Sequence, residues 1–154
     1  MSQRSGQRTV AVAILYQQGR FLMQLRDDIP GIYYPGCWAF FGGHLDSGET
    51  PSRAIERELH EEIRYTLPVE PLEFRRYCET AVIRHVFHAP LTVALDRLIL
   101  CEGWDMALLA PDDIERGDFY SPRARQVRPL GSTHRQILLD FLASGLLPTR
   151  ETPS

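Results

Sequence analysis

Residues 43–65 of this chain, GHLDSGETPSRAIERELHEEIRY, constrain its fold more than any other stretch. The second half has the spacing of a helix whose two adjacent faces differ in chemistry. Ile55, Leu59 and Ile63 recur at i, i+4 and i+8, which predicts a buried apolar stripe. Residues three and four positions apart share a helix surface, so three carboxylates fall on the neighbouring face. We therefore expect a helix that packs on a core and gathers Glu58, Glu61 and Glu62 beside it.

The carboxylate face indicates a metal site. Like charges at these spacings repel by a few tenths of a kcal/mol on an open helix, and a hard divalent cation removes that repulsion. Magnesium and manganese prefer carboxylate oxygens. A solvated acidic face is the alternative, but the preceding residues favour the metal: Gly42 and Gly43 follow an apolar run, and Thr50 and Pro51 suit the N-cap and first helical position. A strand, a glycine loop and a carboxylate-lined helix can hold metal-bound phosphate.

The stretch resembles the Nudix box, whose pattern is G-x5-E-x7-R-E-U-x-E-E-x-G-U with U a bulky apolar residue. The positions in register are Gly43, Glu49, Arg57, Glu58, Leu59, Glu61, Glu62 and Tyr65. Arg64 stands where the family has glycine, near a helix end where a left-handed backbone favours glycine. With a positive φ, arginine there should cost about 1 kcal/mol; a helix that runs one turn longer is the alternative. Either outcome leaves the acidic set intact. Phe41 is a milder departure, because many Nudix proteins have proline there.

The resemblance implies a divalent-metal-dependent hydrolase of a nucleoside diphosphate linked to another group, with Mg²⁺ as cofactor and Mn²⁺ as a substitute. A nucleoside triphosphate that releases pyrophosphate is the first choice of substrate. Nucleotide sugars and dinucleotide polyphosphates remain alternatives. A non-catalytic nucleotide-sensing domain is an alternative of another class, although the complete acidic set argues against it. An isopentenyl diphosphate isomerase needs further metal and acid residues that have no candidates here.

The resemblance also implies roles for individual residues. The Gly43 carbonyl would join Glu58, Glu61 and Glu62 as a metal ligand. Glu49 and Arg57 look like the pair that steadies the loop against the helix, with Arg57 orienting a glutamate through charge-assisted hydrogen bonds. A carboxylate must also orient or deprotonate water. We favour Glu58 for this catalytic role, and another glutamate inside or outside the box remains open.

Residues outside this stretch complete the predicted site. Many family members recruit another carboxylate from a later loop, and Glu102, just past a strand-like run, is our candidate metal ligand. An ordinary loop glutamate is the alternative, and Glu79 and Asp105 are held in reserve. Three further residues are candidates for substrate binding, with a solvated strand end or a place in the core as their alternatives. They are Arg26, Trp38 and Phe40.

Hydrophobic patterning predicts the remaining elements. Residues 9–16 and 20–26 read as strands joined by a turn at Gly19. Residues 72–88 read as two antiparallel strands, and residues 91–100 as a further strand. A final helix over 133–143 has a capping box at Thr133 and Gln136 and a glycine stop at Gly145. Strands mixed with helices predict an α/β fold, and the resemblance implies the Nudix α/β/α sandwich with a mixed sheet.

Length and composition indicate the number of domains, the class of partner and the cellular location to expect. A chain of 154 residues predicts one domain, residues 1–154, with flexible tails at 1–7 and 148–154. The net charge of −3 provides no general attraction to nucleic acid or to an anionic membrane, so a small-molecule nucleotide is the expected partner. The three cysteines lack metal-ligand spacing and indicate reduced thiols, and no signal peptide is apparent, so we expect a cytoplasmic protein. The oligomeric state is left open, with a homodimer as one option.

Overall fold

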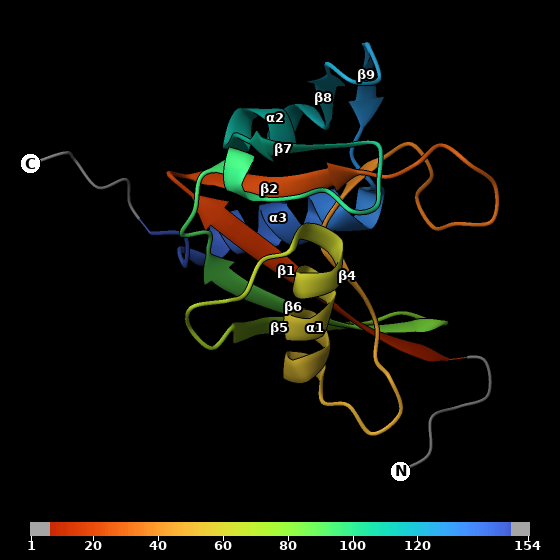
Figure 1. Cartoon of the computed structure of the whole chain (residues 1–154), viewed down its shortest axis with the longest axis vertical. Helices are drawn as coiled ribbons and strands as arrows, with labels where there is room; N and C mark the ends of the chain where they lie inside the picture. Colours follow the sequence, from red (N-terminus) through yellow and green to blue (C-terminus); the bar gives the residue numbers. More distant parts are fainter. Residues whose placement is uncertain (1–6, 149–154) are drawn as a thin grey trace, which may run out of the picture.

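The computed structural model describes residues 7–148, so the two predicted tails lie outside the described residues except for Gln7 and Pro148. A seven-stranded mixed sheet forms the centre of the protein (Figure 1). Its strands are β1 (Arg8–Gln17), β2 (Arg20–Leu25), β3 (Trp38–Ala39), β4 (Phe41–His44), β5 (Leu72–Cys78), β6 (Val82–Pro90) and β7 (Asp105–Leu109). The helices are α1 (Pro51–Ile63), α2 (Pro111–Arg116) and α3 (Ser132–Ser144), with a 3₁₀ turn η1 at Leu95–Arg97.

Strand β1 organises the sheet because it pairs along both of its edges. It runs parallel to β6 on one side, and on the other it pairs antiparallel with β2 and β4. The predicted hairpin between β1 and β2 is confirmed. Its two turn residues, Gln18 and Gly19, both have positive φ (50° and 75°), as a tight hairpin turn requires. Strand order is β3-β2-β1-β6-β5, with β7 added beside β2.

Helices cover both faces of this sheet, so the predicted α/β/α sandwich with a mixed sheet is confirmed (Figure 1). Alternate residues of β1 point to opposite faces, as strand geometry requires. Ala11, Ala13 and Leu15 belong to the core that contains the apolar stripe of α1. Val12 and Ile14 belong to the second core, under α3. The α1 stripe of Ile55, Leu59 and Ile63 is fully buried, and each side chain contributes about 1.5–3 kcal/mol through burial.

The predicted strand at 91–100 is wrong, and its actual path matters for the site. The segment contains η1 and then crosses the C-terminal end of α1. The N–H of Ile99 donates to the Ile63 carbonyl at 3.2 Å, and the N–H of Cys101 donates to the Glu62 carbonyl at 2.9 Å. These are carbonyls of the last helical turn, which have no partner within a helix. Satisfying them outweighs the strand preference of the apolar residues and brings the chain after Cys101 toward Glu62.

Two other local predictions differ from the structure. The capping box of α3 is absent, because Gly131 is the N-cap and Thr133 instead accepts a hydrogen bond from the Tyr34 hydroxyl at 2.6 Å. Gly145 ends α3 in the left-handed conformation, as predicted. Residues 118–129, for which no element was predicted, form a hairpin of β8 (Asp118–Ser121) and β9 (Gln126–Pro129). This hairpin is seen beyond β7 in Figure 1 and is largely exposed, so hydrophobic patterning did not reveal it.

Candidate active site

Both ends of the carboxylate-bearing helix α1 are capped, and the N-terminal cap is the one predicted from the sequence. The Thr50 hydroxyl accepts a hydrogen bond from the Arg53 N–H at 3.2 Å, and Pro51 occupies the first helical position. At the other end Arg64 adopts the left-handed conformation, with φ 55° and ψ 35°, and its N–H donates to the His60 carbonyl. Arginine therefore makes the same turn as the usual glycine, at the cost of a strained backbone. Helix α1 keeps its direction across the sheet despite this departure.

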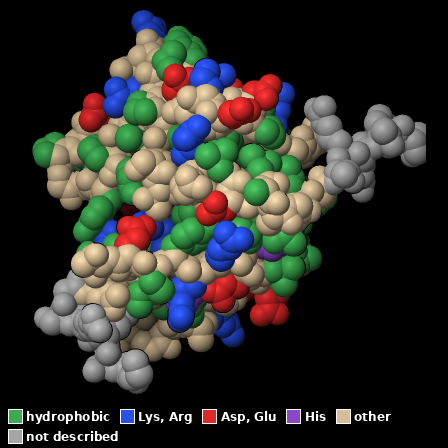
Figure 2. Space-filling model, turned by 180° about the vertical axis from the view of Figure 1, so that it is seen from behind, with side chains coloured by type: hydrophobic (Ala, Val, Ile, Leu, Met, Phe, Trp, Pro, Cys, Tyr) green, Lys and Arg blue, Asp and Glu red, His purple; other side chains and the backbone are tan. Residues whose placement is uncertain are grey.

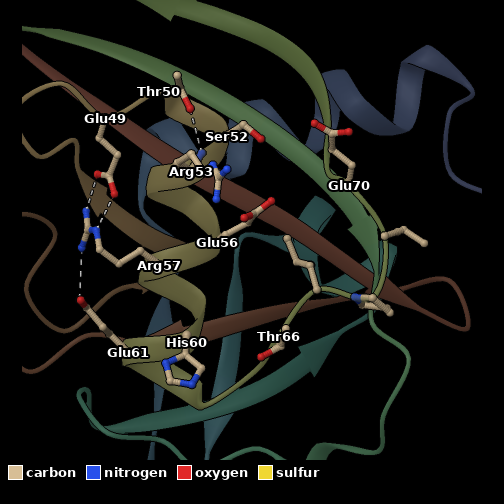
Figure 3. Close-up of a pocket in the computed structure, with 13 residues that line it drawn as sticks. Glu49, Thr50, Ser52, Arg53, Glu56, Arg57, His60, Glu61, Thr66 and Glu70 are labelled. Carbon is tan, nitrogen blue, oxygen red and sulfur yellow. Dashed lines mark hydrogen bonds and ion pairs between the residues drawn. The ribbon is translucent and has the colours of Figure 1, made fainter.

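Arg57 is the centre of an ion-pair network on α1 (Figure 3). Its Nε and Nη2 donate to the two carboxylate oxygens of Glu49 at 2.8 and 2.9 Å, and Nη2 also donates to the His44 carbonyl at 3.0 Å. Its Nη1 reaches Glu58 at 3.0 Å and Glu61 at 3.2 Å. The hydrogen bonds from Arg57 lower the pKa of Glu49 to about 2, so Glu49 stays ionised. One guanidinium thus ties the loop before α1 to the carboxylates on it.

Glu62 is the most enclosed carboxylate of the set, with 7% of its surface exposed. It accepts hydrogen bonds from the Gly42 N–H at 2.9 Å and from Gln24 Nε2 at 3.4 Å. Burial raises the pKa of Glu62 to about 8, and the negative charges of Glu58 and Glu102 add to the rise. Burial also raises the pKa of Glu58, against the lowering effect of Arg57. The charges of Glu58 and Glu102 thus both disfavour the ionisation of Glu62 at this point.

These groups line one cavity of about 230 Å³ between the sheet, α1 and the loop after β2. The acidic side of the cavity is formed by Gly43, Glu58, Glu62 and Glu102. Gly43 is in contact with the Glu58 carboxylate, since a Cβ added to Gly43 would lie 2.6 Å from its Oε1. Basic and aromatic groups line the same cavity. They are Arg8, Arg26, Arg84, Tyr33, Tyr34, Phe40 and His134.

A second cavity of about 500 Å³ adjoins the first. Arg26, Glu62 and Glu102 line both cavities, so these side chains lie between them. The second cavity is completed by Gln24 and by the loop after β2, including Ile29 and Ile32. A ligand larger than the first cavity would extend into the second across Glu62 and Glu102.

Some of the predicted site residues line the first cavity and others do not. Glu58, Glu62, Glu102, Arg26 and Phe40 meet around the first cavity. Glu61 lies outside it: its side chain is 55% exposed, contacts Arg57 and lines a shallow groove on the outer side of α1 (Figure 3).

Other candidates are placed away from the acidic group. Trp38 is fully buried in the core, where its indole N–H donates to the Phe119 carbonyl, so it has no face open to a base. The reserve carboxylates have other partners, since Glu79 pairs with Arg84 and Asp105 accepts a hydrogen bond from Ser121.

Sequence reasoning did not find the basic and aromatic residues of the cavity other than Arg26 and Phe40. Arg84 was not singled out on β6, and His134 lies at the start of α3, fifty residues beyond it. Burial lowers the pKa of His134 to about 3, and the charges of Arg84 and Arg26 lower it further. The Phe40 N–H donates to its Nδ1 at 3.3 Å. The only sequence signal was Arg84 itself, an arginine within a strand of alternating apolar residues.

The acidic side of the cavity fits a divalent cation. Within residues 7–148, no three His, Cys, Asp or Glu side chains are gathered closely enough to enclose an ion as they stand. The reason is visible in their partners, because Arg57 holds Glu58 and Glu61 while Gln24 and Gly42 hold Glu62. Glu58, Glu62 and Glu102 nevertheless share one wall, and a cation would relieve the repulsion that raises the pKa of Glu62. Their oxygen donors are those that magnesium and manganese prefer.

The fold and the site together define an α/β protein with a carboxylate-lined cavity beside a glycine-led helix. A family model for the NUDIX domain matches residues 6–140, and the chain belongs to the Nudix family. The relatives include a nucleoside triphosphatase NudI from Enterobacter sp. strain 638, 36% identical over 72 residues. Another is the NudI of an Escherichia coli strain, 37% identical over 57 residues. These matches cover 45% and 37% of this chain, and only 50% and 40% of the relatives.

Solved structures share the fold over most of the chain. A NUDIX hydrolase from Nitrosomonas europaea has a TM-score of 0.69 at 16% identity, covering 98% of this chain and 78% of that one. A MutT protein from Methanosarcina mazei Go1 has a TM-score of 0.68 at 19% identity, covering 94% and 99%. A bifunctional NMN adenylyltransferase/ADP ribose pyrophosphatase from Francisella tularensis, complexed with AMP and a manganese ion, has a TM-score of 0.68 at 21% identity, covering 90% and 42%. At these identities the likeness concerns the fold alone.

Proposed function

We propose that this protein is a magnesium-dependent hydrolase that cleaves nucleoside triphosphates and releases pyrophosphate. The observation that carries the proposal is the meeting of Glu58, Glu62 and Glu102 on a cavity that guanidinium groups also line. A polyphosphate needs its negative charge neutralised before water can attack phosphorus. Carboxylates that hold cations and arginines that bind anions directly meet that requirement in one cavity.

The residues divide this work between them. The metal would be held by the Gly43 carbonyl and by the carboxylates of Glu58, Glu62 and Glu102. Glu61 is linked to this group by its hydrogen bond with Arg57. Bound Mg²⁺ supplies neutralising charge on the phosphoryl oxygens and lowers the pKa of attacking water. Glu58 accepts the proton of that water, and Arg57 holds its carboxylate in place from the Glu49 side. Arg26, between the two cavities, donates to phosphate oxygens, and Phe40 belongs to the wall that the nucleoside contacts.

The choice of a nucleoside triphosphate is supported by the names of the relatives, which are nucleoside triphosphatases. The match spans only about half of the length of these relatives or less. The second cavity of about 500 Å³ keeps a nucleotide sugar or a dinucleotide polyphosphate as the second candidate. It provides room beyond Glu62 and Glu102 for a group larger than pyrophosphate. A non-catalytic nucleotide-sensing domain would not need a buried carboxylate pair next to a network that positions it.

One experiment separates these substrates. The purified chain is incubated with Mg²⁺ and, in turn, with nucleoside triphosphates, nucleotide sugars and dinucleotide polyphosphates, and the released pyrophosphate, phosphate and monophosphate are quantified. Pyrophosphate from a triphosphate is expected, and none without a divalent cation. Glu62→Gln should abolish turnover, whereas Glu56→Gln makes the same change on α1 at a residue outside the cavity and should not. Binding without turnover of any substrate would overturn the proposal.

The remaining expectations concern partners and location. The described residues contain no helix that is long and apolar enough to cross a membrane. Figure 2 shows acidic and basic side chains interspersed on the face opposite to that of Figure 1, without a continuous basic surface that would attract nucleic acid. We therefore propose a small-molecule nucleotide as the partner. A homodimer and a cytoplasmic location stay predictions.

A further inference from the structure

Two side chains that line the first cavity, Arg84 of β6 and His134 of α3, carry hydrogen-bond donors without a partner in the described part of the chain. Arg84 is 5% exposed, and its Nη1 donates to Glu79 Oε1 at 2.5 Å. Its other guanidinium N–H groups have no partner among residues 7–148, although the side chain lines the cavity. Arginine has five N–H donors in a fixed planar fork, so most of the donors of this buried side chain remain available. Glu79 fixes one side of the fork and leaves the rest for a ligand.

His134 adds a second donor at the same place. It is 6% exposed and lines the same cavity. Its Nδ1 accepts the N–H of Phe40 at 3.3 Å, so the proton of the neutral ring must be on Nε2. Burial and the charges of Arg84 and Arg26 lower the pKa of His134, which keeps the ring neutral. The Nε2–H group has no partner in the described part of the chain and is therefore a further available donor.

Two aromatic rings and two valines also line the cavity that contains these donors. Phe40 and Tyr34 contact the His134 ring edge to face, with centroids 5.1 and 4.9 Å away. Val10 and Val12 of β1 line the same cavity. A planar ring fits such walls, and only hydrogen-bond acceptors on its edge can satisfy the donors. An amino group at that edge would instead place donor against donor and leave both sides unpaired, which is costly in a buried site.

We propose that Arg84 and His134 form a base-reading subsite that selects nucleobases with a ring carbonyl at the edge they face. The inference rests on the proposed nucleotide hydrolase function and deepens it by naming the class of base. Keto bases, such as hypoxanthine, guanine and uracil, present a carbonyl oxygen where adenine and cytosine present an amino group. An arginine fork reads the carbonyl oxygen O6 and the ring nitrogen N7 of a keto purine with two hydrogen bonds. Glu79 is a positioning residue that holds this fork.

Matched substrate pairs test the inference directly. ITP and ATP differ in the group at position 6 of the purine, and UTP and CTP differ at position 4 of the pyrimidine. For the purine pair kcat/KM should be about tenfold higher for ITP, the usual discrimination of a two-bond base contact. UTP should be favoured over CTP by less, because uracil presents only a carbonyl oxygen as acceptor at that edge. Calorimetry with IMP and AMP measures the same preference without hydrolysis. If no triphosphate is cleaved, the proposed function fails, while IMP and AMP binding still decides the base subsite.

Variants assign the preference to named residues. Arg84→Met removes the fork and should lower kcat/KM for ITP toward the ATP value, so that the ratio approaches one. Arg76→Met is the matched control, because Arg76 is exposed on the neighbouring strand β5 and does not line this cavity. His134→Gln retains a neutral donor and should keep part of the preference. Melting temperatures of all variants show whether each chain is folded before its kinetics are compared.

Three results would overturn the inference. Equal kcat/KM for ITP and ATP in the unmodified chain, with equal binding of IMP and AMP, would show that the donors do not read the base. A uniform loss for all four nucleotides in Arg84→Met, together with weaker binding of inorganic pyrophosphate, would show that Arg84 binds phosphate instead. A preserved ITP preference in folded Arg84→Met would assign the selection to other residues.

Discussion

The guanidinium of Arg57 holds both carboxylate oxygens of Glu49, at 2.8 Å and 2.9 Å, across the loop that leads into α1. Bidentate arginine–carboxylate pairs combine energy with geometric specificity. The remaining nitrogen of the same guanidinium reaches Glu58 at 3.0 Å. Arg57 therefore fixes Glu58 relative to the loop that follows Gly43 and β4, which is the arrangement a catalytic carboxylate needs.

Arg57→Ala should reduce turnover far more than it reduces stability. The side chain is on the surface of α1 away from the apolar stripe, so little packing is lost. Small misplacements of a catalytic group cost on the order of a hundredfold in rate, so a loss of about that size in kcat is expected. Steady-state kinetics and thermal melts on one preparation separate the two effects. Arg53→Ala on the same helix, at an exposed position outside both cavities, is the control.

Glu102→Gln should weaken binding of Mn²⁺ or Mg²⁺. Its charge acts on Glu62, and both side chains line the same two cavities. Removing one of the carboxylates should lower the affinity for the ion severalfold to tenfold, because the number of charged ligands sets the affinity of oxygen-ligand sites. Calorimetric titration with each metal measures this, and Glu115→Gln on the exposed side of α2 is the matched control. Unchanged affinity in Glu102→Gln would remove Glu102 from the site.

Arg64→Gly should stabilise the protein. Arg64 is exposed and has φ 55°, a left-handed conformation that glycine adopts without steric cost. Relieving the strain should contribute up to about 1 kcal/mol, which corresponds to a rise of about 2–4 °C in Tm for a chain of this size. Arg64→Ala keeps a Cβ and should bring no such gain. Equal melting temperatures for Arg64→Gly and Arg64→Ala would show that the helix end is unstrained.

Acid should destabilise the protein partly through His134. Its folded-state pKa lies at about 3, well below the usual value of about 6.5, because the neutral ring is buried. The stability it contributes is complete above the unfolded pKa and is lost as the pH falls below it, since only the unfolded state then binds the proton. Between about pH 6 and pH 4 the free energy of unfolding should fall by up to about 1.4 kcal/mol per pH unit from this residue. Denaturant unfolding of the unmodified chain and of His134→Gln across this range measures it; parallel curves would contradict the prediction.

The sequence by itself determined the local parts of this protein. The 3.6-residue period of Ile55, Leu59 and Ile63 sufficed to predict α1, and Thr50 and Pro51 sufficed to place its start. The turn at Gly19 and the glycine stop at Gly145 followed from backbone conformations that glycine favours. Each of these depends on neighbours within a few residues, where side-chain spacing and backbone sterics act directly.

Only the tertiary structure decided which distant groups share the cavity. Glu102 lies beside Glu62 because the N–H of Cys101 donates to the Glu62 carbonyl at the end of α1. The same demand for backbone partners turned an apolar segment, expected as a strand, into a path across the helix. Trp38 is in the core and Phe40 is at the cavity, although both precede the glycines. Arg84 and His134 meet across fifty residues because α3 packs on the face of the sheet to which Arg84 and Val86 of β6 point, and long-range packing of this kind leaves no periodic signal in the chain.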